Sequence, residues 1–158
     1  MKVLGIDPGY DRLGVAVGEK ENGQEKLIFS DCILTDKNTE LSDRIHLAGR
    51  AFKELLDKYQ PDAVALETIF FNKNIKTAIG VAQMRGVLLF LAKEAGCLVY
   101  EYGPQEIKVA VTGYGKSDKK AVIDMIKRLV LNTPDLALDD EYDAIAVSVT
   151  CLAHYRSI

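Results

Sequence analysis

The chain has 158 residues, of which 48% are hydrophobic and 27% charged, and its formal net charge is −3. These values predict a single soluble globular domain over residues 1–158, large enough to bury a core without disulfides or structural metals. No apolar run approaches the roughly 18 residues of a membrane span, and three cysteines without metal-like spacing indicate reduced thiols in a cytoplasmic protein. The mild acidity argues against a nucleic-acid enzyme unless the basic residues gather away from the acidic ones.

The first half of the chain alternates apolar runs with turn signals. The pair Asn22-Gly23 is a strong hairpin signal. Between Leu41 and Tyr59, apolar residues recur at helical spacing, which predicts a helix. The expected strands are Lys2–Asp7, Leu13–Glu19, Lys26–Leu34 and Asp62–Glu67.

The second half carries helical patterns around one further strand, Leu98–Tyr102. The expected elements are a long helix over Asn74–Ala95, a short helix after Pro104, a loop over Thr112–Lys116, a helix capped by Ser117 and running to about Leu131, and a last helix from Asp139 or Asp140 to about Tyr155. An antiparallel opening followed by alternating helices and strands predicts an α/β fold: a five-stranded mixed sheet flanked by helices on both faces.

Acidic residues stand at three places where the pattern predicts the end of a strand or the start of a helix. Asp7 and Glu67 each end an apolar strand, where a carboxylate is costly unless it has a partner. Asp140 and Asp143 share one face of a helix's first turn. A capping, salt-bridging or helix-dipole role is the alternative for each acid, and Asp139 also reaches this face.

Together, these carboxylates suggest a metal centre. Four converging carboxylates without histidine or cysteine suit hard divalent cations such as Mg²⁺ or Mn²⁺. Two such ions can clamp a phosphodiester, one helping to generate hydroxide and the other stabilising the leaving oxygen. The pattern therefore favours metal-dependent hydrolysis of a nucleic acid.

Five segments in chain order resemble the RuvC family of resolvases. They are Gly5-Ile6-Asp7-Pro8-Gly9, Leu66-Glu67-Thr68-Ile69-Phe70-Phe71-Asn72, Gln83-Met84-Arg85-Gly86, Val111-Thr112-Gly113-Tyr114-Gly115 with Asp118-Lys119, and Asp140-x-x-Asp143-Ala144. The resemblance covers nearly the whole chain, with Leu13 standing where many members carry threonine. It implies an RNase H-like endonuclease that makes paired symmetric nicks in four-way DNA junctions during recombination and repair.

The resemblance also implies roles for individual residues. Two Mg²⁺ ions, for which Mn²⁺ could substitute, would be held by Asp7, Glu67, Asp140 and Asp143. Phe70 would stack on or wedge a base at the crossover, and Lys108 and Lys119 would contact phosphates near the cut. The wider set of expected DNA contacts is Phe71, Lys73, Lys76, Arg85, Lys116 and Lys120.

The implied assembly is a homodimer that works with the branch-migration proteins RuvA and RuvB. A two-fold dimer presents one active site to each of two opposed strands of a junction. The long helix could supply this interface, or its apolar residues could pack into the core. The residues in question are Ile75, Ile79, Ala82, Gly86, Leu89 and Leu91.

Three other readings share part of the pattern. Actin-like or sugar-kinase proteins also begin with a G-x-D-x-G loop, but they need a second such domain and a second glycine-rich phosphate loop. A RuvX-type or RNA-cutting nuclease would share the fold, and the Gln83–Gly86 and Thr112–Gly115 segments argue against it. A non-catalytic junction-binding module would be expected to lack one of the acids, and none is missing.

Overall fold

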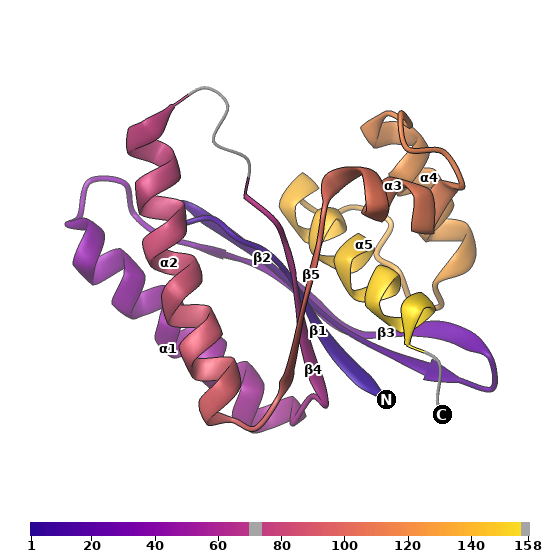
Figure 1. Ribbon diagram of the computed structural model, residues 1–158, viewed down its shortest axis with the longest axis horizontal. Coiled ribbons are helices and arrows are strands. Elements are labelled where there is room, and N and C mark those ends of the chain that lie inside the picture. The colour runs from indigo at the N-terminus through magenta and orange to yellow at the C-terminus, as the bar shows by residue number, and fades with distance from the viewer. Residues whose placement is uncertain (70–73, 156–158) are drawn as a thin grey trace.

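A five-stranded mixed sheet forms the centre of the computed structural model, which describes residues 1–69 and 74–155 (Figure 1). The sheet order is β3-β2-β1-β4-β5. The elements are β1 (Lys2–Asp7), β2 (Arg12–Glu21), β3 (Gln24–Leu34), α1 (Leu41–Tyr59), β4 (Ala63–Glu67), α2 (Ile75–Glu94), β5 (Leu98–Tyr102), α3 (Pro104–Thr112), α4 (Lys119–Leu129) and α5 (Asp139–His154). The RNase H-like arrangement expected from the sequence is confirmed.

Local chemistry sets the strand pairing at the start of the chain. Asn22 and Gly23 both have positive φ angles, 51° and 85°, so they close the tight β2–β3 hairpin that their sequence predicts. β1 pairs antiparallel with β2 and parallel with β4, and β4 pairs parallel with β5. Because β1 and β4 are parallel neighbours, their carboxyl ends lie side by side at the same end of the sheet.

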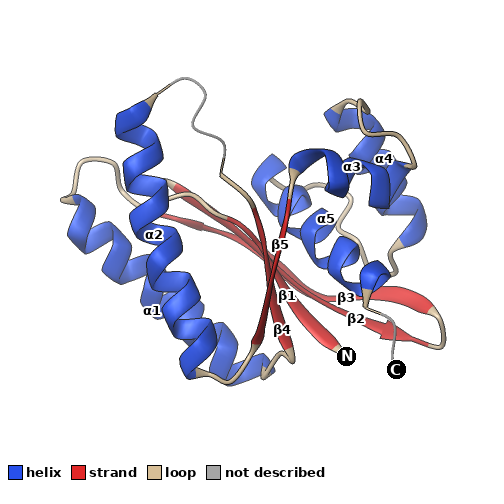
Figure 2. Cartoon of the chain, in the orientation of Figure 1, coloured by secondary structure: helices blue, strands red, loops and turns tan. Residues whose placement is uncertain are grey.

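Helices cover both faces of the sheet (Figure 2). α1 and α2 pack on one face, and α3, α4 and α5 lie on the other. Side chains alternate along β1 as the strand pleat requires: Leu4 and Ile6 join the core beneath α1 and α2, and Val3 joins the core beneath α5. The β-strands that carry the acids are thus buried on both sides and rigidly placed.

Glycines let α5 rest directly on the sheet. A Cβ at Gly5 in β1 would overlap the carbonyl of Ala144, and a Cβ at Gly14 in β2 would overlap the carbonyl of Asp140. A Cβ at Gly18 would lie 2.6 Å from the hydroxyl oxygen of Ser148 in α5. This close approach brings the acidic first turn of α5 against the ends of β1 and β2.

The boundaries of α4 differ from the sequence expectation. Asp118, not Ser117, caps the helix, since its carboxylate accepts from the backbone N–H of Ala121 at 2.8 Å. Ser117 is buried and its hydroxyl is already engaged, donating to the carbonyl of Tyr114 at 2.7 Å. The helix ends at Leu129 because Leu131 pairs with the β3 edge, donating to and accepting from its backbone.

α2 is apolar around most of its circumference, yet it buries only a narrow stripe. Gly80, Met84, Leu88 and Ala92 face the core. With a mean hydropathy of 1.4, the helix is long and apolar enough to cross a membrane by length and composition alone, properties that it shares with core helices of soluble proteins. Much of its apolar surface is therefore exposed on the protein.

Candidate active site

Four carboxylates, from the beginning, middle and end of the chain, lie near the carboxyl ends of the central strands. Asp7 ends β1 and Glu67 ends β4, and the two strands are neighbours, with Ile6 paired to Leu66. Asp140 lies in the first turn of α5 and Asp143 begins the next turn, and the glycine contacts hold this end of the helix against β1 and β2. The strand pairing and the glycine contacts thus bring the acids close enough for Asp143, Glu67 and Asp140 each to raise the pKa of Asp7.

Burial and mutual repulsion raise the pKa values of three of these acids. Burial, followed by the charges of Asp143, Glu67 and Asp140, raises the pKa of Asp7 from 3.8 to about 8. Burial also raises the pKa of Glu67 and that of Asp143, and the charge of Asp143 adds to the effect on Glu67. Carboxyl groups whose pKa values are raised by burial and by neighbouring charges are common at functional sites.

Two cations partly offset this negative charge. Lys119 Nζ lies 2.9 Å from Asp143 Oδ2 and 3.5 Å from Asp139, and Arg12 Nη1 lies 3.6 Å from Asp140. The Asp143 hydrogen bond raises the pKa of Lys119, although burial opposes the shift. The role of Arg12 was not foreseen, because its partner is far away in sequence.

The donor chemistry of the four acids fits a hard divalent cation. Within residues 1–69 and 74–155, no three acidic, histidine or cysteine side chains are arranged so that they could hold an ion as they stand. Two of the four carboxylates instead pair with cations of the protein itself, Asp143 with Lys119 and Asp140 with Arg12. A metal would have to compete with these ion pairs.

Asp139 and Asp140 differ in their surroundings. The Asp140 side chain is 27% exposed and its charge acts on Asp7, whereas the Asp139 side chain is 66% exposed and pairs with Lys119. This contrast supports Asp140 as the ligand and Asp139 as an outer charge.

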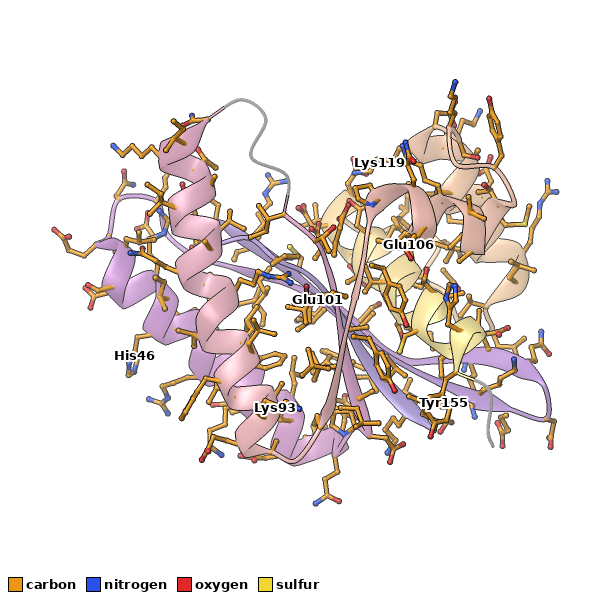
Figure 3. The ribbon with its side chains drawn as sticks, in the orientation of Figure 1. His46, Lys93, Glu101, Glu106, Lys119 and Tyr155 are labelled. Carbon is orange, nitrogen blue, oxygen red and sulfur yellow. The ribbon has the colours of Figure 1, made fainter. Side chains whose placement is uncertain are left out.

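A pocket of about 200 Å³ opens beside the acids. Its lining comprises Glu67, Pro104, Ile107, Lys108, Lys119, Val122, Asp143 and Ala146. Lys108 on α3 and Lys119 on α4 give it two positive charges, and both lower the pKa of Glu67. Figure 3 labels Lys119 on the side of the molecule where α3 and α4 lie. Acids and lysines in one pocket can hold a metal and a phosphate together.

The remaining expected DNA contacts fall into different settings. Phe70, Phe71 and Lys73 lie outside the described residues. Lys116 and Lys120 are exposed near α4, beside the pocket lysine, whereas Lys76 is exposed in the first turn of α2, on the other face of the sheet. The exposed lysines are free to meet a phosphate backbone.

Arg85 differs from these lysines. Its side chain is only 11% exposed, and Nη2 pairs with Glu101 Oε1 at 2.5 Å. Nη1 donates to the backbone carbonyl of Glu67 at 2.8 Å. The sequence predicts a DNA contact for Arg85, whereas in the fold both terminal nitrogens contact the protein itself.

Comparison with known proteins gives consistent matches over almost the full chain. The family model described as "Crossover junction endodeoxyribonuclease RuvC" matches residues 3–151. A protein of that name from Thermosipho melanesiensis is 43% identical over 153 residues, covering 97% of each chain. The structure of Thermus thermophilus RuvC superposes with a TM-score of 0.89 at 30% identity, covering 98% of this chain and 95% of that one. The same protein in complex with a Holliday junction substrate gives 0.88 at 31% identity, covering 95% of this chain and 92% of that chain.

Proposed function

The chain belongs to the RuvC family of crossover junction endodeoxyribonucleases, and from this membership we propose that it resolves Holliday junctions by paired symmetric nicks. It is a nuclease of DNA recombination and repair. The observation that carries the proposal is the pocket in which Glu67 and Asp143 adjoin Lys108 and Lys119. Asp7 and Asp140 lie near it, since the charges of Glu67, Asp143 and Asp140 all raise the pKa of Asp7. Residues 1–158 form its single nuclease domain.

Nucleases of this family are metal-dependent. We propose that the four carboxylates hold two Mg²⁺ ions, for which Mn²⁺ can substitute. The bound metal would supply an activated water and neutralise charge on the leaving oxygen. Burial and the neighbouring acids raise the pKa of Asp7 to about 8 in the metal-free protein, so metal binding would release a proton and metal affinity would rise with pH.

The protein's own cations would hold the DNA. Lys108 and Lys119 stand on the pocket wall, where a scissile phosphate would pass. Lys119 now donates to Asp143, and we propose that it turns to the phosphate when the acids take up their metals. Phe70, with Phe71, is proposed to hold an unstacked base at the crossover.

An exposed apolar stripe on α2 supports a homodimer. Four of the residues considered for the interface are exposed, and two are half-buried against the core. The exposed residues are Ile75, Ile79, Ala82 and Gly86, and Phe90, 63% exposed, extends the stripe. An exposed apolar stripe of this kind suits the interface of a two-fold dimer, whose symmetry matches that of a junction. The dimer is proposed to act in the cytoplasm with RuvA and RuvB.

A cleavage assay tests the proposal. The unmodified protein, Glu67→Gln and the control Asp57→Asn, an exposed acid on α1, are incubated with a mobile four-way junction or a matched linear duplex, with and without Mg²⁺. We expect paired nicks in the junction only with Mg²⁺, no cutting by Glu67→Gln despite junction binding, and full activity in Asp57→Asn. Equal cutting of linear duplex or of an RNA–DNA hybrid would contradict the assignment.

A further inference from the structure

Arg85 connects three elements at the end of β4. The side chain leaves α2 and runs inward, so that little of it meets solvent. One terminal nitrogen holds the carbonyl of Glu67, the last residue of β4, and the other holds the carboxylate of Glu101 on β5. Figure 3 labels Glu101 in the region between α2 and the sheet. A planar guanidinium fork can make both bonds at once, whereas a lysine ammonium presents a single point of charge.

The bonds of Arg85 hold the backbone at Glu67, the residue of β4 that belongs to the proposed metal site. The strand ends at Glu67, and the next backbone N–H, that of Thr68, donates to Tyr102 of β5 at 2.9 Å. The peptide between Glu67 and Thr68 is therefore held from both sides, by Arg85 at its carbonyl and by β5 at its N–H. Fixing this peptide fixes the direction in which the Glu67 side chain leaves the strand.

The part of α2 that carries Arg85 is itself packed closely against the protein. One and a half turns earlier on α2, Gly80 packs against the ring of Tyr10, and a Cβ at Gly80 would stand 2.6 Å from that ring. Tyr10 belongs to the turn that follows Asp7, and the guanidinium of Arg44 lies 4.9 Å from the centre of its ring. The same helix thus braces the segment after Asp7 and the segment that carries Glu67.

We propose that Arg85 is a positioning residue that aims Glu67 into the metal site, and that it makes no contact with DNA. The inference rests on the proposed metal-binding role of Glu67. Outer partners of metal ligands typically change metal affinity by about 10- to 100-fold. A DNA phosphate contact, by contrast, changes the dependence of junction binding on salt, by about 0.9 in the slope of log K against log salt. The two roles therefore have different signatures.

The experiment measures both signatures on the full chain. Mn²⁺ binding to the DNA-free protein is followed by titration calorimetry, and junction binding is measured across a salt series in chelator. The variants are Arg85→Gln, Arg85→Lys and the control Lys93→Gln, which removes one charge from the last turn of the same helix. We expect both Arg85 variants to lose about tenfold or more in Mn²⁺ affinity with an unchanged salt slope, and Lys93→Gln to keep both.

Two further variants keep the outcome decisive. If Arg85 variants do not fold, Glu101→Gln removes only the counter-charge of Arg85, and we expect a smaller loss of Mn²⁺ affinity with the salt slope unchanged. Unaltered Mn²⁺ affinity in these variants, together with a shallower slope for the Arg85 variants, would overturn the positioning role. Glu67→Gln serves as the reference: if it binds Mn²⁺ as well as the unmodified protein, the proposed metal site itself fails, and the positioning role with it.

Discussion

Replacing Asp7 with asparagine should make the metal-free protein more stable at alkaline pH. The pKa of Asp7 in the folded protein is about 8, whereas an aspartate in an unfolded chain titrates near 3.8. Between these values the folded protein binds a proton that the unfolded chain does not. The contribution of Asp7 to folding stability is therefore greatest below about pH 4, falls as the pH rises toward 8, and then levels off. Asparagine carries no such proton, so Asp7→Asn should lack this fall.

The size of the effect follows from the shift. Roughly four pH units at 1.36 kcal/mol per unit set a ceiling of about 5–6 kcal/mol on the stability lost. Asp7 is only partly buried, and water and movement of Arg12 and Lys119 will relieve part of the repulsion, so we expect about 2–3 kcal/mol. For a domain of this length, that corresponds to a rise in Tm of about 5–10 °C in Asp7→Asn at pH 8.

Thermal melts in chelator, from about pH 5 to about pH 9, measure the difference. The unmodified protein, Asp7→Asn and the exposed control Asp57→Asn are compared at each pH. The Tm of Asp7→Asn should rise above that of the unmodified protein as the pH increases, and that of Asp57→Asn should not. Two curves that stay parallel over the whole range would refute the crowding of carboxylates around Asp7.

Three further perturbations test other parts of the molecule. Gly14→Ala places a methyl against the carbonyl of Asp140 and should cost about 1–3 kcal/mol in melts while abolishing junction nicking; full activity would mean that α5 can lift without harm. Ile79→Asp puts a charge on the exposed stripe of α2 and should yield monomers in sedimentation, whereas an intact dimer would place the interface elsewhere. Lys108→Ala and Lys119→Ala should each reduce the salt slope of junction binding by about 0.9, and an unchanged slope would separate that lysine from DNA.

Local signals in the sequence were sufficient for most of the fold. The Asn22-Gly23 turn, the apolar runs of the strands and the helical spacing between Leu41 and Tyr59 each act over a few residues, and each element appears where its pattern predicts. The cap of α4 was misplaced because Ser117 and Asp118 are both good capping residues. Only the fold decides between them, by giving the Ser117 hydroxyl another acceptor.

In the candidate site, too, some residues can be predicted from local sequence and others only from the fold. Asp7 and Glu67 could be found because an acid at the end of an apolar strand is unusual in itself. The contacts between Arg12 and Asp140 and between Arg85 and Glu67 could not, since they join residues far apart in sequence whose meeting depends on helix packing. A charged side chain on a helix carries no local sign of whether it points to solvent or beneath the sheet.

The close packing of α5 against the glycines of β1 and β2 also has a consequence for the order in which the site forms during synthesis. Asp7 leaves the ribosome early, but Asp140 and Asp143 emerge only with the last helix, and until then the face of β1 and β2 that receives α5 has no cover. Contacts across so much chain form late in folding. A nascent chain or a product truncated before residue 139 holds only half of the carboxylates, so the capacity to cut DNA arrives only with a nearly finished polypeptide.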